Sequence, residues 1–323
     1  MILATMNITF MFTAYGPPGP INYVFFSFTF FIYIVSVLAN IALMTVIYLE
    51  PSLHKPMYIF LVNLAINGLI GSSAICPKIL QNLLEDIQRI SYQDCFLQVF
   101  FINIYVTTAY AILTVMAYDR YVSICKPLQY HTIMTSSKMR QLLFIVYFIP
   151  VFTISVQVYL SSQIPLCRYT IHRLFCDNLA IMNLSCVQSK LSNLYGISVI
   201  AGLVVFPLFL VVLSYVKILI VCLKTSKEAQ KKALSTCTPH LITFLNFSFV
   251  SLFSVTYNRF HMYLPGEVQT FMTIHFSFIP PLLHPIIYGM RTKEIRKGIA
   301  KLSRRRVFTI SLPNTKLSIS NPF

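Results

Sequence analysis

Long runs of apolar residues alternate with short polar segments along almost the whole chain. Seven of these runs are about as long as a bilayer is thick, and they cover residues 21–49, 56–80, 96–124, 139–161, 192–223, 229–257 and 268–288. A helix of about 20 apolar residues spans the roughly 30 Å hydrocarbon core of a membrane. The pattern therefore predicts an all-α membrane protein, a seven-transmembrane helix bundle, with span ends defined only to within a few residues.

The composition agrees with a membrane protein built as one unit. Of the 323 residues, 56% are hydrophobic and only 11% are charged, which leaves too little polar surface for a soluble protein. No internal repeat is visible, and seven spans do not divide into the two equal halves of common transporter folds. We expect an extracellular N-terminal tail over residues 1–20, a seven-transmembrane domain over 21–290, and a cytoplasmic amphipathic helix with a C-terminal tail over 291–323.

The basic residues predict how the chain is oriented. Residues 1–20 contain no Lys or Arg, so they lack the positive start of a cleaved signal peptide, and we expect the first span to act as an uncleaved signal anchor. With the N-terminus outside, most of the basic residues fall on the cytoplasmic side, as the positive-inside rule requires. They are Lys55, Arg120, Lys126, Lys138, Arg140, Lys217, Lys224, Lys227, Lys231, Lys232 and those from Arg291 onward.

The net charge of +16 is thus explained by topology, and no nucleic-acid partner is needed. Residues 291–306, with the sequence RTKEIRKGIAKLSRRR, form a basic amphipathic stretch that suits the anionic inner leaflet of the bilayer. A charge run that is merely solvated is the alternative. The sequon Asn7-Ile8-Thr9 is an expected glycosylation site because it precedes the first span, whereas the sequon at Asn246 lies inside an apolar run.

Eight cysteines divide according to this topology. Cys95, Cys167, Cys176 and Cys186 are expected outside, where disulfides persist, and four cysteines allow three pairings. The other four lie in spans or on the cytosolic side and are expected to be free thiols: Cys76, Cys125, Cys222 and Cys237. No Cys-x-x-Cys pair or His partner at ligand spacing indicates a metal site.

Enzymatic motifs are absent from the sequence. It contains no Gly-rich phosphate loop, no His-Glu-x-x-His and no Gly-x-Ser-x-Gly, so we expect neither catalysis nor a cofactor. A channel or transporter would carry ionisable residues in mid-membrane, and the cores of these spans are almost free of them.

One charged pair stands where the third apolar run ends. The stretch MAYDRYVSICKPLQY, residues 116–130, places Asp119 beside Arg120 at this edge. Charges there often mark function, although a snorkelling pair at the membrane surface is the alternative. Three further stretches accompany it: PMYIFLVNLAINGL at 56–69, KALSTCTPHL at 232–241 and PPLLHPIIYGMRTKEIR at 280–296. The pair Ser214-Tyr215, downstream of Pro207, is a fourth feature of the same kind.

In their order and spacing, these stretches closely resemble the odorant receptor family of rhodopsin-like (class A) G-protein-coupled receptors. The Thr-Pro and Phe-Ser variations near Pro239 and Ser248 resemble its fish-type branch. The resemblance implies binding of small, mostly neutral odorants and activation of a stimulatory heterotrimeric G protein that raises cyclic AMP. It also implies residence in the plasma membrane of olfactory cilia. A rhodopsin-like receptor used outside olfaction, or a transporter, are the alternatives.

The resemblance also assigns roles to residues. Asp119 is expected to restrain Arg120 at rest, and the other switch residues are expected to be Tyr121, Tyr215 and Tyr288. It pairs Cys95 with Cys176 and Cys167 with Cys186. It places the ligand in the outer half among the third, fifth, sixth and seventh helices, although each of the following residues suits ordinary helix packing equally well: Ile102, Asn103, Val106, Thr107, Val199, Leu203, Ser248, Ser251, Leu252, Val255 and Ser277.

Three positions depart from the family pattern. Gly68 and Ala109 stand where the family often has acids, and His284 stands where it has Asn. In the family these residues belong to a polar cluster associated with a sodium ion. Without carboxylates to offset its desolvation, a cation is not expected here. We expect an uncharged His284 bonded to Asn67, Asn40 or a backbone carbonyl, and agonist potency that does not depend on sodium.

Overall fold

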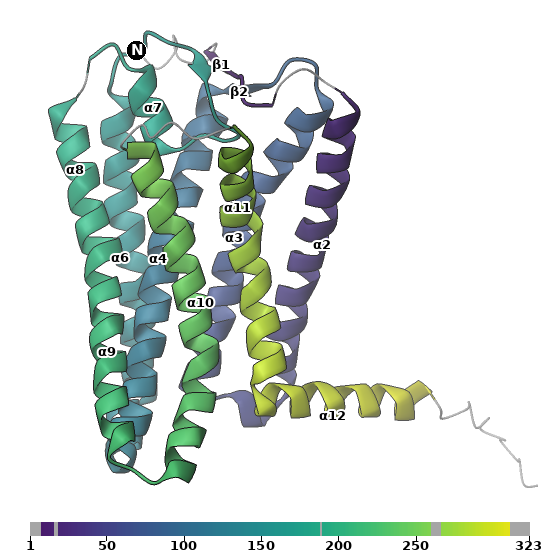
Figure 1. The fold of residues 1–323 in the computed structure, drawn as a ribbon, viewed down its shortest axis with the longest axis vertical. Helices are drawn as coiled ribbons and strands as arrows, with labels where there is room; N and C mark the ends of the chain where they lie inside the picture. Colours follow the sequence, from purple (N-terminus) through teal and green to yellow (C-terminus); the bar gives the residue numbers. More distant parts are fainter. Residues whose placement is uncertain (1–7, 16–18, 188, 260–265, 311–323) are drawn as a thin grey trace, which may run out of the picture.

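A bundle of long helices, running side by side, makes up most of the molecule (Figure 1). The computed structural model describes residues 8–15, 19–187, 189–259 and 266–310. The long helices are α2 (Pro20–Leu49), α3 (Pro56–Leu84), α4 (Tyr92–Cys125), α6 (Ser136–Ser162), α10 (Lys227–Arg259) and α11 (Gly266–Arg291). One further rod is built from α8 (Lys190–Ile200), η3 (Ala201–Val205) and α9 (Phe206–Leu223).

Six of these rods are apolar enough to cross a membrane. Within the described residues they are α2, α3, α4, α6, the rod from Lys190 to Leu223, and α10. The first six predicted spans fall on these helices. α11, which contains Pro280, Pro281 and Pro285, packs against α2, α3 and α10 in the same bundle. α12 (Lys293–Ile310) turns away at the foot of the bundle.

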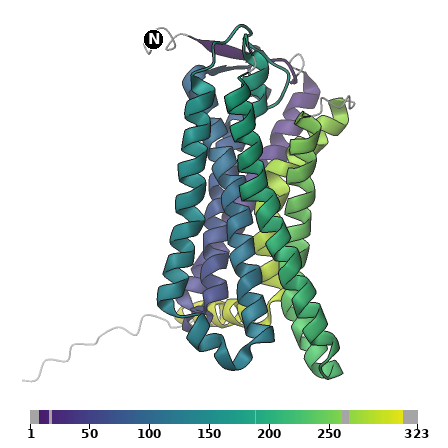
Figure 2. The same ribbon diagram turned by 90° about the vertical axis from the view of Figure 1, so that its left-hand side faces the viewer.

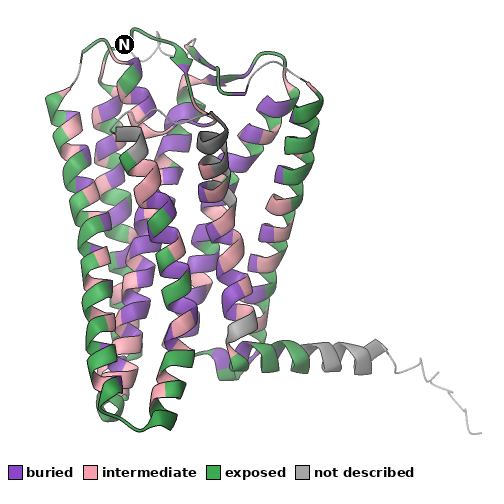
Figure 3. Ribbon diagram, viewed as in Figure 1, coloured by how far each residue is buried: buried purple, intermediate pink, exposed green. Residues whose placement is uncertain are grey.

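α4 is the central helix. In its most apolar window 61% of the residues are buried, compared with 22% in α2, in α6 and in the rod from Lys190 to Leu223. Figure 3 shows the buried positions turned toward the interior and the exposed ones on the outer surface. Exposed apolar side chains such as Phe31, Phe152 and Leu213 lie on that outer surface, where lipid solvates them. A residue on α4 therefore has neighbours on several helices at once.

Caps extend two helices beyond the predicted spans. The third span was expected to begin at residue 96, but α4 begins at Tyr92 because the Ser91 hydroxyl accepts a hydrogen bond from the Asp94 backbone N–H at 3.0 Å. Likewise α10 begins at Lys227, where the Ser226 hydroxyl accepts from the Ala229 N–H. An N-cap side chain satisfies backbone donors that hydrophobicity does not reveal.

The π-helical segment η3 interrupts the fifth rod. The backbone N–H of Phe206 bonds to the carbonyl of Ala201, five residues back, and Pro207 follows. Proline has no N–H and its ring clashes with the carbonyl four residues earlier, so one wider turn relieves the helix. The apolar pattern did not predict this change of helical phase.

A small sheet forms at the end of the bundle opposite to α12, as the two views agree (Figures 1 and 2). Strand β1 (Thr9–Phe12) pairs antiparallel with β2 (Arg89–Ser91) and parallel with β3 (Thr170–Ile171). The buried side chains of Phe10 and Phe12 anchor β1. The prediction of a purely helical protein was therefore incomplete, because these strands are too short to show a period in sequence.

α12 packs against the foot of α2 and the turn that follows it. Lys301 Nζ lies 2.9 Å from Glu50 Oε2. Gly298 packs so closely that an added Cβ would lie 3.3 Å from Val46 and 3.5 Å from Leu53 of η1 (Pro51–Leu53). Since only glycine leaves this space free, the helix approaches the bundle without displacing either side chain.

Candidate functional site

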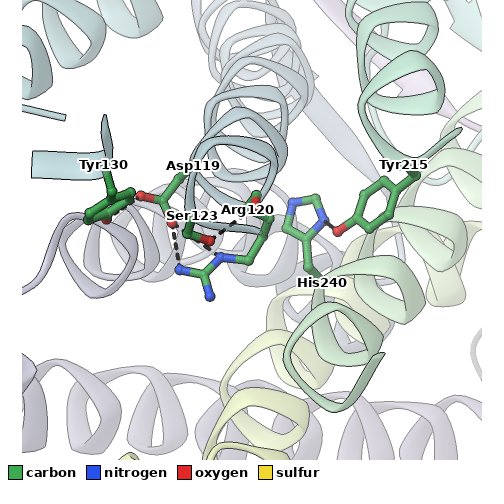
Figure 4. A network of polar contacts seen from close by, with 6 residues as sticks. All are labelled: Asp119, Arg120, Ser123, Tyr130, Tyr215 and His240. Carbon is green, nitrogen blue, oxygen red and sulfur yellow. Dashed lines mark hydrogen bonds and ion pairs between the residues drawn. The ribbon is translucent and has the colours of Figure 1, made fainter. Parts of the chain in front are cut away.

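Asp119 and Arg120 lie at the inner end of α4 and form an ion pair (Figure 4). Arg120 Nη2 lies 2.5 Å from Asp119 Oδ2, and the carboxylate side chain is 0% exposed while the guanidinium side chain is 13% exposed. The Tyr130 hydroxyl donates to the other oxygen, Oδ1, at 2.8 Å. The structure thus brings the two expected residues together and adds a third, Tyr130, from the short helix α5 (Tyr130–Ile133).

Tyr130 remains a donor because its hydroxyl holds its proton. Burial, and secondarily the negative charge of Asp119, raise the pKa of the Tyr130 hydroxyl above its ordinary value. A buried carboxylate needs its lone pairs satisfied. Arg120 and Tyr130 together occupy both oxygens of Asp119, and this holds the guanidinium toward α5.

Tyr215 belongs to a second network that does not include the Arg120 side chain (Figure 4). Nε2 of His240 lies 2.9 Å from the Leu113 carbonyl, and Nδ1 lies 2.6 Å from the Tyr215 hydroxyl. The carbonyl only accepts, so Nε2 carries the hydrogen and Nδ1 accepts from Tyr215. The fully buried His240 of α10 therefore ties α9 to α4.

His240 was missed at the sequence level. It stands in the quoted stretch KALSTCTPHL, directly after Pro239, as a single histidine in an apolar run. Polar residues inside membrane spans tend to be functional, which is the signal that was available.

The other two expected switch residues are placed differently. The Tyr121 ring lies under Lys217 of α9, whose Nζ is 5.7 Å from the ring centroid. Tyr288 of α11 is fully buried, and its hydroxyl has no hydrogen-bond partner among the residues described. Neither side chain joins the two networks above.

A cavity of about 120 Å³ lies in the half of the bundle nearer the small sheet, the half that we expect to face outward. Seven of the expected ligand residues line it: Ile102, Asn103, Val106, Thr107, Val199, Ser251 and Val255. Leu203, Ser248 and Leu252 do not line it, and the side chain of Ser277 lies outside the described residues. Leu203 falls within the π-helical segment η3, where the helical phase changes. Its side chain packs against the cluster of Ile104, Ile154 and Val199 instead.

Residues from the loop between α6 and α8, and one residue from α6, complete the cavity wall. Phe175 and Asp177 flank Cys176, and Gln157 comes from α6. None of them was predicted, because the expected wall consisted of the third, fifth, sixth and seventh helices only. Asp177 ion-pairs with Arg173, and it accepts from the Ala180 N–H to cap α7 (Asn178–Leu184).

Two disulfides fix this loop. They join Cys95 to Cys176 and Cys167 to Cys186, with Cα separations of 5.5 and 4.9 Å, and these are the pairs that the resemblance implies. The Cys176 N–H also donates to Gln98 Oε1 at 2.8 Å. Cys76, Cys125, Cys222 and Cys237 are free thiols. The first disulfide and the Gln98 contact together hold Phe175 and Asp177 over the cavity.

The expected hydrogen bond of His284 is absent. The side chain is buried, and neither ring nitrogen has a partner among the described residues. Asn40 Nδ2 instead donates to the Pro281 carbonyl at 2.9 Å, and Asn67 Nδ2 donates to the Tyr105 carbonyl at 2.9 Å. These bonds to backbone carbonyls of α11 and α4 mean that neither amide donates to His284, and the amide oxygens Asn40 Oδ1 and Asn67 Oδ1 have no donor among the described residues either.

No metal site accompanies this cluster. Over the part of the chain that the structure describes, no three His, Cys, Asp or Glu side chains are placed to hold an ion.

Comparison with known proteins extends over most of the chain. A family model described as olfactory receptor matches residues 28–305. The chain is 39% identical over 270 residues to human "Olfactory receptor 56A5", an alignment that covers 83% of this chain and 86% of that protein. It is 34% identical over 300 residues to human "Olfactory receptor 5K3", covering 93% and 92%. With human "Olfactory receptor 52K1" the identity is 34% over 278 residues, covering 85% and 88%.

Proposed function

This chain belongs to the olfactory receptor family, and on that premise we propose that it binds small, mostly neutral molecules in the outer half of its bundle and activates a stimulatory heterotrimeric G protein. Members of this family are G-protein-coupled receptors and not enzymes. The chain is accordingly an odorant receptor and a multi-pass protein of the plasma membrane. The consequence of activation in our proposal is a rise in cyclic AMP.

The proposed topology has the N-terminus outside and seven spans. α11 is the seventh span, since it packs in the bundle between α10 and the pair α2 and α3. Residues 1–20 are then extracellular, residues 21–290 form the receptor domain, and residues 291–323 are cytoplasmic. α12 lies on the inner leaflet, which attracts its basic residues. Asn7, outside the described residues, is the proposed glycosylation site, and olfactory cilia are the proposed location.

The proposed mechanism is a shift between two packings of the bundle. At rest Asp119 and Tyr130 hold Arg120, while His240 ties α9 to α4. In the active packing Arg120 leaves Asp119 and turns toward Tyr215 and the G protein, and Tyr288 stabilises the rearranged core. A ligand drives this change only by binding the active packing more tightly than the resting one.

The observation that carries the proposal is the position of both regions on one helix. Asn103, Val106 and Thr107 of α4 line the outer cavity, and Asp119 and Arg120 end the same helix at its inner edge. α4 is the most buried of the six apolar rods, so a change in its packing at one end also changes its contacts at the other end.

The test is odorant-evoked cyclic AMP in cells that express the surface-labelled receptor. We expect Arg120→Ala to reach the surface and to lose the response, because the contact with the G protein is lost. The matched control is Arg140→Ala on α6. The side chain of Arg140 is exposed, and this variant should respond normally. A normal response of the Arg120 variant would refute the switch assignment, and no odorant-evoked or basal signal in any variant would refute receptor function.

A further inference from the structure

Gln157 is a buried amide in the wall of the outer cavity. The residue is 6% exposed, and its Oε1 has no hydrogen-bond partner among the described residues. Its Nε2 lies beside Gly196 of α8, 3.5 Å from the position where a Cβ would stand. A buried amide oxygen without a partner destabilises the fold, so a ligand that donates a hydrogen bond to it recovers that loss.

The hydroxyls of Thr107 and Ser251, which line the same cavity as Gln157, have already used their hydrogens. Thr107 Oγ1 donates to the Asn103 carbonyl at 2.7 Å. Ser251 Oγ donates to the Phe247 carbonyl at 2.7 Å and receives the Tyr110 hydroxyl at 2.7 Å. A hydroxyl has one hydrogen and two lone pairs, so both side chains face the cavity chiefly as acceptors.

The charge in the wall is balanced. Among the described residues that line the cavity, Asp177 is the only ionisable acid or base. Its Oδ2 pairs with Arg173, and its Oδ1 accepts from the Ala180 N–H. Among the described residues of the wall, an anionic ligand would find no free cation, and an ammonium ligand would compete with Arg173 for Asp177. A neutral ligand avoids both penalties.

From these three observations we infer that the outer cavity is specific for a neutral hydroxyl compound, an alcohol or a phenol, anchored by Gln157. This inference rests on the proposed receptor function and names its ligand class. A hydroxyl donates one hydrogen bond to Oε1 or to the acceptors around it, and it accepts one from Nε2. A ketone or aldehyde of the same skeleton only accepts. A volume of about 120 Å³ suits a ligand of about the size of benzene, which fills an engineered cavity of about 150 Å³.

The experiment compares matched alcohol and ketone pairs on cells expressing the receptor. Cyclohexanol with cyclohexanone, and benzyl alcohol with benzaldehyde, differ mainly in the hydroxyl hydrogens. We expect the alcohol of each pair to be more potent by about tenfold, the effect of one to two hydrogen bonds. Cyclohexylamine and cyclohexanecarboxylate, the charged analogues, should be weaker than cyclohexanol.

Two variants assign the effect to Gln157. Gln157→Leu should lower the potency of the alcohols to that of the ketones, because the amide is gone while the apolar wall remains. Gln163→Leu is the matched control, since Gln163 is exposed near the end of α6 and bonds to Ser162 instead of lining the cavity. It should leave the preference for alcohols intact. Surface labelling separates a binding defect from a folding defect.

Each contrary outcome has a distinct meaning. Equal or greater potency of the ketones, or a preference that survives in Gln157→Leu, overturns the hydroxyl class while receptor function stands. No response to any of the compounds overturns the hydroxyl class as well. In that case Asp119→Asn, which should raise basal cyclic AMP without a ligand because it frees Arg120, decides whether the receptor couples to a G protein at all.

Discussion

Tyr130 reaches Asp119 from outside the helix that carries the Asp119–Arg120 pair. Its hydroxyl donates to Asp119 Oδ1 at 2.8 Å, and Arg120 takes the other oxygen. A typical hydrogen bond contributes a net of about 0.5–1.5 kcal/mol to the packing that contains it. Tyr130 therefore keeps Asp119 oriented toward Arg120 and stabilises the resting packing.

Tyr130→Phe removes that hydroxyl and nothing else. We expect basal cyclic AMP to rise by roughly fivefold, the effect of about 1 kcal/mol on the equilibrium between the two packings. Basal cyclic AMP, normalised to surface-labelled receptor, is the measurement. Tyr48→Phe, at a position 79% exposed, is the matched control and should leave the basal level unchanged. An unchanged basal level in Tyr130→Phe would remove Tyr130 from the switch.

Gly68 is a second position where one residue decides the chemistry. An added Cβ would lie 3.4 Å from Pro281 Cβ and 3.8 Å from Asn40 Oδ1, an oxygen that has no donor among the described residues. There is room for a methyl group, but a carboxylate here would face another acceptor. Ala109, which is fully buried, supplies no second carboxylate with which to hold a cation.

We therefore expect Gly68→Asp to destabilise the folded receptor by about 3 kcal/mol or more, the penalty of an uncompensated buried charge. Gly68→Ala tests the space alone and should be nearly neutral. Surface expression and the thermal stability of the solubilised receptor provide the measurement. If Gly68→Asp were as stable as Gly68→Ala, and agonist potency then depended on sodium, the account of this cluster would be wrong.

Single residues were predictable from the sequence only when a motif marked them. Asp119 and Arg120 stood out because they are charged at the edge of an apolar run. Gln157 and His240 were missed, since their importance depends on what surrounds them. Gln157 lines a cavity, and its side-chain oxygen has no hydrogen-bond partner among the described residues. His240 bridges the carbonyl of Leu113 and the hydroxyl of Tyr215. Such partners come from other helices, and no spacing along one helix reveals them.

At the scale of elements, the loop between α6 and α8 forms part of the wall of the cavity. The Cys95–Cys176 disulfide ties it to the start of α4, and Phe175 and Asp177 then reach the cavity. The bond closes a loop of 81 residues, and cross-links of that size stabilise by about 4 kcal/mol in the chain-entropy model.

Cys95→Ser and Cys176→Ser should each reduce surface expression strongly. The double variant should be little worse than either single variant, because all three lack the same bond. Additive losses in the double variant would show that the two cysteines act separately. Mass spectrometry of the non-reduced protein identifies the pairs directly, and a peptide that links Cys95 to Cys186 would contradict the pairing.

Elements with a strong apolar signal were predicted well, and the short ones were not. The first six spans coincide with six long helices because membrane burial demands about 20 apolar residues in each. The phase change at η3 and the strands β1 to β3 depend on local hydrogen bonding. A proline at residue 207 permits a wide turn but does not require one, and a strand of two to four residues has no measurable period.

At the scale of the whole molecule, the outer cavity and the inner networks are linked through the packing of the bundle. The cavity wall includes α4, α6, α8 and α10, and the inner contacts join α4 to α5, α9 and α10. Two helices, α4 and α10, thus take part at both ends. In the proposed mechanism, a packing that opens the inner contacts also changes the shape of the cavity, and this would give a ligand the differential affinity that activation requires.

The central claim is that the ligand and the contacts of Arg120 act on the same equilibrium between the resting and active packings. The most direct test is thermodynamic linkage between basal activity and agonist affinity. Tyr130→Phe weakens the resting packing without touching the cavity, so it should raise agonist affinity by nearly the factor by which it raises basal cyclic AMP. The measurement is the affinity of the most potent compound from the alcohol and ketone pairs, determined for wild type and for Tyr130→Phe on membranes without nucleotide. A roughly fivefold gain in affinity alongside a fivefold gain in basal activity is the predicted result. A raised basal level with unchanged affinity would contradict the claim, because the two ends of the bundle would then respond independently.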